Sequence, residues 1–199
     1  MDVLNNFLPQ EYQDYLAFHF MQPHMIWNYY TDTVDYNIGN ADLKKSGVII
    51  NDFTKDSHQL VHTFIDKGRQ VSDKVSLLDP IFFFLKKHYG ISGNKFYRVK
   101  LNMMFQDTSY DQSKFYNPPH TDVPLSYPNN YKIFLYYPID SDGDTIIFNE
   151  RETADNLTIN SRQTPTKGTA IIFDAKQLHC STPPVTHKHR LALNIVYHA

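Results

Sequence analysis

The stretch PTKGTAIIFDAKQLHCSTPPVTHKHRLALNIVY, residues 165–197, determines the class of fold. Residues 165–168 have the composition of a turn, and residues 169–173 form a short apolar segment. In residues 190–197, large apolar side chains alternate with smaller or polar ones. In an extended chain this alternation puts Arg190 on a face with small and polar residues, and the leucines on the other face. Short strands separated by such turns are typical of an antiparallel sandwich or barrel.

The same period of two extends back to about residue 95 of the 199-residue, 23.3 kDa chain. The other segments of this kind are residues 96–105, 132–139, 144–149 and 156–160. We therefore expect an α+β protein of one domain, residues 1–199. Residues 95–198 would form the strand-rich core, and residues 1–94 mainly supporting helices and edge strands, the latter within residues 25–53.

Three segments before residue 95 have the spacing of helices. Residues 10–22 carry one apolar stripe, and residues 56–68 place Leu60, Val61, Phe64 and Ile65 on one face. The third segment is marked best, with Asp79 as the N-cap, proline in the first helical position and Gly90 at the C-terminal end.

Composition and charge exclude several classes of protein. Nineteen Lys and Arg residues nearly balance 21 Asp and Glu residues, so no global positive field favours nucleic acid or an anionic membrane. Cys180 is the only cysteine, which excludes an internal disulfide framework and indicates a reducing compartment. We expect a soluble cytoplasmic protein with no membrane partner, because no apolar run approaches membrane-spanning length and residues 1–6 lack a signal-peptide pattern.

The triplet His120-Thr-Asp122 is a candidate metal site, because residues two apart on an extended chain point the same way. Alone, the triplet is weak evidence. His179 follows the strand at residues 169–173 and offers a third ligand. Two histidines and one carboxylate on one face of a metal are typical of non-haem Fe(II) oxygenases, in which the other coordination positions stay open. Arg190 begins an apolar strand and needs an anionic partner if it faces inward; otherwise it lies in solvent at the rim of the sheet.

The C-terminal half, residues 95–198, resembles the 2-oxoglutarate and Fe(II)-dependent dioxygenases, closest to their prolyl-4-hydroxylase-like branch. The residues that carry the resemblance are, in order, His120-x-Asp122, Phe134-Leu-Tyr-Tyr137, Asp142-Gly-Asp-Thr-Ile-Ile-Phe148, Pro165–Phe173, His179 and Arg190. The N-terminal phrase Asn6-Phe7-Leu8-Pro9 is also similar to the start of small oxygenases, some of them encoded by phages, for which the location would be the host cytoplasm.

The resemblance implies a double-stranded β-helix, or jelly roll, and a set of site residues. His120, Asp122 and His179 would bind Fe(II). Arg190 would pair with the distal carboxylate of 2-oxoglutarate, and Tyr137 would support the same carboxylate. Tyr136 would replace Tyr137 if the alignment were shifted by one residue. Asn102 would contact the cosubstrate or, alternatively, point outward beside Arg98 and Lys100.

The activity that the resemblance implies is hydroxylation of an unactivated C–H bond by O2, with release of succinate and CO2 and with ascorbate as a reductant. The substrate would be a prolyl residue of a peptide or protein, or else a free amino acid or another small molecule. A halogenase is disfavoured because Asp122 occupies the position that chloride needs. Nucleobase demethylation is disfavoured because Val196 stands where those relatives carry a second arginine.

Two interpretations of other functional classes stay open: a metal-stabilised jelly-roll binding module without activity, and a zinc hydrolase, which would leave Arg190 and Tyr137 without a role.

Two departures from the family pattern concern the turn and the substrate. Gly143-Asp144 replaces a frequent Gly-Gly pair, and Met104 or Phe105 stands where some peptide hydroxylases have an active-site tyrosine. The loop at residues 106–119 is either a lid over a ligand or a surface loop pinned by its aromatic rings. The oligomeric state is not predicted.

Overall fold

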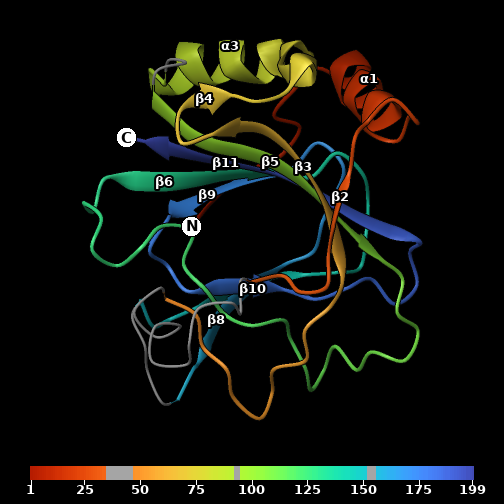
Figure 1. The fold of residues 1–199 in the computed structure, drawn as a ribbon, viewed down its shortest axis with the longest axis vertical. Coiled ribbons are helices and arrows are strands. Elements are labelled where there is room, and N and C mark those ends of the chain that lie inside the picture. The colour runs from red at the N-terminus through yellow and green to blue at the C-terminus, as the bar shows by residue number, and fades with distance from the viewer. Residues whose placement is uncertain (35–46, 92–94, 152–155) are drawn as a thin grey trace.

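The computed structural model describes residues 1–34, 47–91, 95–151 and 156–199, which form two β-sheets with helices on one side (Figure 1). The helices are α1 (Gln10–Phe20), the 3-10 helix η1 (Asp73–Leu78) and α3 (Asp79–Tyr89). The strands are β1 (Asp2–Leu4), β2 (Asn28–Tyr30), β3 (Gln59–Asp66), β4 (Arg69–Gln70), β5 (Phe96–Phe105), β6 (Tyr131–Tyr136), β7 (Thr145–Phe148), β8 (Ile159–Gln163), β9 (Ala170–Asp174), β10 (His179–Ser181) and β11 (His189–His198).

The larger sheet has eight strands in the order β1-β9-β6-β11-β5-β3-β2, with β4 paired to β3. The smaller sheet has the order β10-β7-β8. Every pair among these strands is antiparallel. The smaller sheet lies beneath the larger one, and the chain passes repeatedly from one sheet to the other (Figure 1). The expected jelly roll of antiparallel strands is therefore confirmed.

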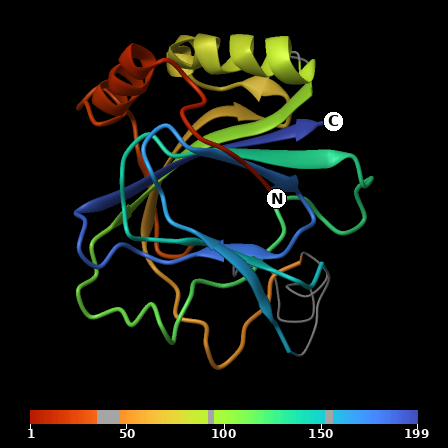
Figure 2. The same cartoon turned by 180° about the vertical axis from the view of Figure 1, so that it is seen from behind.

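Strand β11 separates two apolar cores by the alternation of its side chains. Leu191, Leu193 and Ile195 pack into the core between the larger sheet and the helices, which cover its outer face (Figure 2). Ala192 and Val196 pack into the core between the two sheets, together with Ile147 of the smaller sheet. Because successive side chains of a strand point to opposite faces, Arg190 and Asn194 also face the space between the sheets.

Residues 59–66 form strand β3, and the predicted helix over this segment is wrong. Val61, Thr63 and Ile65 are β-branched and pack well on a pleated surface. β3 lies between β2 and β5, so its backbone groups are paired along both edges. This long-range pairing overrides the helical spacing of the apolar residues. Residues 1–94 therefore supply strands β1 to β4 to the larger sheet, in addition to the supporting helices.

Helix α3 ends at Gly90 as predicted, because glycine takes the left-handed conformation there (φ 66°) and its N–H bonds the Lys86 carbonyl. Its start differs by one residue. Leu78 is the N-cap and Asp79 is the first helical residue, because η1 runs directly into α3. Asp79 still lies in the first turn, where a carboxylate suits the helix dipole.

The strand predictions differ from the structure mainly at their ends. The largest shift concerns β8, which was predicted at residues 156–160 and spans Ile159–Gln163. The predicted segment begins directly after residues 152–155, which lie outside the described ranges. Of the predicted edge strands in residues 25–53, β2 is present, whereas residues 35–46 are not described. No helix within the described ranges combines the length and hydrophobicity that a membrane span requires.

Candidate metal centre

His120 and His179 come from segments far apart in the chain and face each other as backbone partners. His179 is the first residue of β10, and His120 forms an isolated antiparallel bridge to it. The His120 N–H donates to the His179 carbonyl at 2.9 Å, and the His179 N–H donates back at 3.1 Å. The two ring centroids are consequently 4.7 Å apart.

Both imidazoles present Nε2 to the space between the sheets. His120 Nδ1 lies 3.0 Å from the Pro118 carbonyl, and His179 Nδ1 lies 2.9 Å from the Gln177 carbonyl. A carbonyl oxygen only accepts, so Nδ1 carries the proton in each ring and Nε2 carries a lone pair. This arrangement fixes both the tautomer and the ring orientation that a metal ligand needs.

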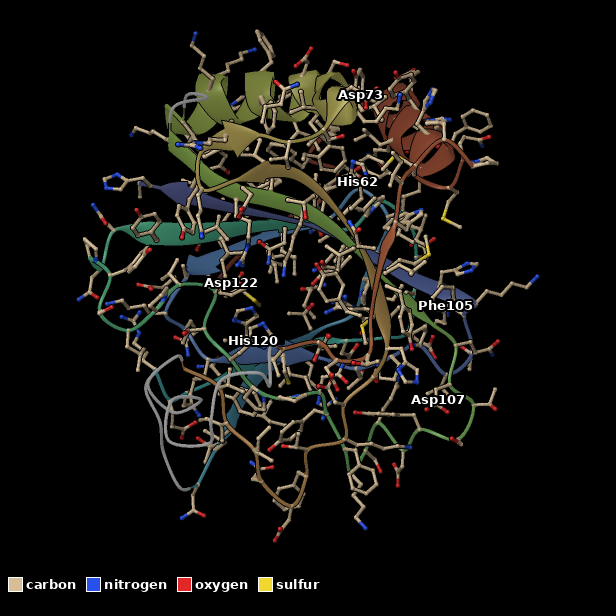
Figure 3. All side chains as sticks on the ribbon, in the orientation of Figure 1. His62, Asp73, Phe105, Asp107, His120 and Asp122 are labelled. Carbon is tan, nitrogen blue, oxygen red and sulfur yellow. The ribbon has the colours of Figure 1, made fainter. Side chains whose placement is uncertain are left out.

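Asp122 brings the carboxylate to the same place. Its N–H donates to the Ala175 carbonyl at 2.9 Å, which ties the segment to the end of β9. Arg98 Nη2 on β5 donates to Oδ1 at 2.5 Å, and Asn194 Nδ2 on β11 donates to Oδ2 at 2.7 Å. The carboxylate is thus oriented by two strands of the larger sheet. Figure 3 shows Asp122 and His120 in the space between the two sheets.

The electrostatics keep all three groups in the forms that bind a cation. Burial, together with the neighbouring His179, lowers the pKa of His120 to about 3. Burial also lowers the pKa of His179. For Asp122, burial favours the neutral acid, but Arg98, His179, Lys100 and His120 together outweigh it and hold the pKa well below its ordinary value. At neutral pH the site offers two neutral imidazoles and one carboxylate.

The geometry fits a metal ion bound on one face. The ligand atoms of His120, Asp122 and His179 all lie within 4.8 Å of one another, and His179 Nε2 is 3.8 Å from Asp122 Oδ2. Two imidazoles and a carboxylate are the donor set of non-haem Fe(II) sites with open positions, whereas closed structural zinc sites use four protein ligands. Within the described part of the chain, no other cluster of three such side chains occurs.

Arg190 lies inside the protein, with 3% of its surface exposed. Its Nε donates to the Gly143 carbonyl at 2.7 Å and its Nη2 donates to Thr145 Oγ1 at 2.7 Å. Among the described residues no carboxylate forms an ion pair with it. Gly143 is required by this packing, since a Cβ there would lie 2.8 Å from Arg190 Cδ and 2.5 Å from the Thr182 carbonyl oxygen. The alternative of a solvent-exposed Arg190 at the sheet rim does not apply.

The two adjacent tyrosines lie on opposite faces of the larger sheet. Tyr137 is fully buried, and its hydroxyl donates to Thr145 Oγ1 at 2.8 Å, the same oxygen that Arg190 bonds. Burial raises the pKa of Tyr137 to about 12, so the hydroxyl keeps its proton. Tyr136 packs into the core under the helices, where its hydroxyl finds no partner among the described residues. Only Tyr137 is therefore linked to the Arg190 group.

Two hollows meet at the metal-ligand cluster. A small cavity of about 50 Å³ is lined by Arg190, Thr145 and Asn102, and also by His120 and His179. Asn102 Oδ1 is buried there without a hydrogen-bond partner in the described part of the chain. A larger cleft of about 840 Å³ opens on the other side; Arg98, His120 and Asp122 line it. His120 thus borders both hollows, whereas Arg190 lines only the small cavity and Asp122 lines only the larger cleft.

Four residues around the site were missed by the sequence analysis: Arg98, Lys100, Thr145 and Asn194. A signal for two of them was available, because Arg98, Lys100 and Asn102 recur every second residue on β5 and so share one face. That face turns toward the two hollows, so the alternative that Asn102 points outward beside Arg98 and Lys100 is wrong. Thr145 and Asn194 carry no such signal, because single polar residues in buried strands are also common in cores.

The loop at residues 106–119 is pinned by its aromatic rings. The Tyr110 hydroxyl donates to the Lys55 carbonyl at 2.8 Å, and the Tyr116 hydroxyl contacts the Asn51 amide at 3.1 Å. Both rings are buried, and neither lines the small cavity or the larger cleft. Cys180, next to His179, is a buried member of a separate apolar cluster and is also among the residues that line the small cavity; burial raises the pKa of its thiol.

No protein-family model and no curated protein matches the chain. Solved structures do share its fold. A 2OG-Fe(II) oxygenase family oxidoreductase from Burkholderia pseudomallei aligns with a TM-score of 0.60 at 13% identity, over 98% of this chain and 84% of that chain. The epimerase SnoN from nogalamycin biosynthesis, non-haem and α-ketoglutarate dependent, gives 0.60 at 12% identity over 98% and 77%. A Pseudomonas putida prolyl-4-hydroxylase gives 0.56 at 14% identity over 99% and 91%. The fold is therefore that of 2-oxoglutarate and Fe(II) oxygenases.

Proposed function

We propose that this protein is a 2-oxoglutarate- and Fe(II)-dependent dioxygenase that hydroxylates an unactivated C–H bond. The observation that carries the proposal is a single cavity that joins two features. One is the cluster of His120, Asp122 and His179, of which the two histidines line this cavity, and the other is Arg190, a buried guanidinium without an ion-pair partner in the described part of the chain. A dicarboxylate that chelates a metal with one end and meets a guanidinium with the other fits this pairing.

Bound Fe(II), with 2-oxoglutarate as cosubstrate, supplies the activation of O2 for hydroxylation, and 2-oxoglutarate leaves as succinate and CO2. The protein supplies the ligands and their orientation. The Nδ1–H bonds to the Pro118 and Gln177 carbonyls keep Nε2 of each histidine directed at the metal. Arg98 and Asn194 hold the Asp122 carboxylate in one rotamer, so that the site is formed before the metal arrives.

Arg190 is assigned to the distal carboxylate of 2-oxoglutarate. The Gly143 carbonyl and Thr145 Oγ1 accept from two of its nitrogens and fix the plane of the guanidinium. Tyr137 acts through Thr145, because its hydroxyl donates to the same oxygen. Asn102 is assigned to a second contact with the cosubstrate, since its side chain lines the same cavity and its Nδ2 amide can donate to a carboxylate.

For the substrate, we propose a prolyl residue of a peptide or protein, which rests on the sequence resemblance and on the fold shared with a prolyl-4-hydroxylase. The second candidate is a free amino acid or another small molecule. The fold is also shared with an epimerase of nogalamycin biosynthesis, so the fold alone does not define the substrate. The larger cleft, of about 840 Å³, has room for either class.

The decisive experiment is an anaerobic titration of the Fe(II)-loaded protein with 2-oxoglutarate. The visible metal-to-ligand charge-transfer band should form in the parent and be absent from His120→Ala. His88→Ala is the matched control, because His88 is exposed on the outer helix α3 and should leave the band intact. Bound iron without a band or measurable 2-oxoglutarate affinity would instead make a metal-stabilised binding module the better interpretation.

A further inference from the structure

Lys100 is a charged residue that the proposed chemistry does not use. It lies on β5 between Arg98 and Asn102, two residues from each, and therefore shares their inward face. Its strand partners are Thr63 on β3 and Asn194 on β11. The side chain borders both the larger cleft and the small cavity, so it lies where the two hollows meet beside the metal ligands.

The Lys100 ammonium group has no hydrogen bond and no ion pair with any residue of the described ranges. The charged groups that act on it are Arg98, which is repulsive, and Asp122, which is attractive. Asp122 already accepts from Arg98 through Oδ1 and from Asn194 through Oδ2. Burial and Arg98 lower the pKa of Lys100 to about 8, so the group is still mainly cationic at neutral pH.

A partly buried cation without a partner costs free energy, and proteins retain such groups mainly where a ligand completes them. The metal is no such ligand, because it repels an ammonium. The distal carboxylate of 2-oxoglutarate already has Arg190, at the far end of the small cavity. Among the described residues, the carboxylates that line the larger cleft form no ion pair with Lys100, so an anion bound in that cleft would complete the ammonium group.

We propose that Lys100 binds a carboxylate of the substrate at the junction of the two hollows, and that the substrate is a free α-amino acid. This inference rests on the proposed oxygenase function. It selects the second substrate candidate, the small-molecule class, over the prolyl residue that the sequence resemblance and the shared fold favour. The larger cleft also carries Asp32 and Asp66, acidic groups of the sign that an α-ammonium requires. A prolyl residue inside a peptide chain carries neither a carboxylate nor an ammonium group, whereas a free amino acid carries both.

The test uses the Fe(II)- and 2-oxoglutarate-loaded protein under anaerobic conditions. The probes are the protein L-amino acids and the primary amide of each, and the readout is the perturbation of the charge-transfer band. We expect at least one amino acid to bind and its amide to bind at least about tenfold more weakly. Lys100→Met should weaken binding of that amino acid about tenfold to hundredfold, and Lys100→Arg should retain most of it. Lys132→Met, an exposed position on β6, is the matched control.

A readout independent of iron comes from the apo protein with its lysines methylated by ¹³C-formaldehyde. The methyl resonance of Lys100 is identified by its absence from the spectrum of Lys100→Arg. In the methylated parent protein this resonance should shift when the amino acid is added with 2-oxoglutarate and Zn(II), and it should not shift when the amide is added instead. Equal binding of acid and amide, or no amino acid bound across the panel, would overturn the assignment. So would a Lys100→Met or Lys100→Gln protein that loses affinity for 2-oxoglutarate, since Lys100 would then serve the cosubstrate. A parent protein that forms no 2-oxoglutarate complex would instead refute the oxygenase proposal.

Discussion

Replacement of Arg190 by methionine separates a ligand-binding arginine from a structural one. The side chains have similar length, so the change removes the charge without opening a large cavity. Arg190 has 3% of its surface exposed and no carboxylate partner among the described residues, so the apo protein bears the cost of a desolvated cation. The substitution removes that cost but leaves the Gly143 carbonyl without its donor, which costs about 1–3 kcal/mol.

These two effects oppose each other, and we expect the free energy of unfolding of the apo protein to change by less than about 2 kcal/mol. The affinity for 2-oxoglutarate should change far more. A guanidinium that donates two bonds to a carboxylate contributes about 1.5–3 kcal/mol per bond. Loss of both corresponds to roughly 10²–10⁴-fold in the dissociation constant, at tenfold per about 1.4 kcal/mol.

The assay has two parts, urea unfolding of the metal-free protein and anaerobic titration of the Fe(II) form with 2-oxoglutarate. Iron affinity should be nearly unchanged, because Arg190 does not contact His120, Asp122 or His179. Arg69→Met is the control, since Arg69 is an exposed cation on β4. The reasoning is refuted by unchanged 2-oxoglutarate affinity together with a loss of stability above about 3 kcal/mol, the result expected if the hydrogen bonds of Arg190 serve only the fold.

Three further predictions follow from the hydrogen bonds around the site. Asn194→Ala removes a donor to Asp122 and should weaken Fe(II) binding about tenfold to hundredfold by metal titration; unchanged affinity would contradict its positioning role. Tyr137→Phe should weaken 2-oxoglutarate binding, whereas Tyr136→Phe should not, because only Tyr137 bonds the Arg190 group; equal effects of the two variants in the same titration would argue against this. Asp142 is partly buried, which opposes ionisation, but backbone N–H donors hold its pKa well below its ordinary value. The stabilising contribution of Asp142 should therefore be complete above about pH 4 and be lost at lower pH. The free energies of unfolding of the parent and of Asp142→Asn should converge as the pH falls; a difference between them that stays constant down to pH 2 would be evidence against this role.

The strand-rich core illustrates what the sequence predicts well. The alternation in residues 190–197 requires one face to pack on apolar side chains, and Leu191 and Leu193 do so, while Ala192 and Val196 face the other core. The failure at residues 59–66 has a physical reason. Leu60 and Phe64 have helical spacing, but the pairing of β3 with β2 and β5 depends on partners that no local pattern contains.

In the candidate site, too, some residues could be identified from the sequence and others only from the structure. His120, Asp122 and His179 were identified from the sequence through the His-x-Asp triplet and the family resemblance, and the structure brings them together. The roles of Arg98 and Asn194 on Asp122 could not be found, because they depend on the register between β5, β11 and the segment at residues 120–122. An arginine and an asparagine on strands are ordinary until their partner is known.

The sequence by itself determined the antiparallel strand class, the order of the candidate metal ligands and the absence of an internal disulfide framework, because these depend on local periodicity and residue chemistry. Only the tertiary structure decided which side chains face the space between the sheets and which of them find partners there. It shows Arg190 buried without an ion-pair partner among the described residues, Tyr137 joined to it through Thr145, and Lys100 without a partner in the described part of the chain. The physical reason is that charge compensation is a property of spatial neighbours, and β-sheet pairing makes neighbours of residues that are far apart in the chain.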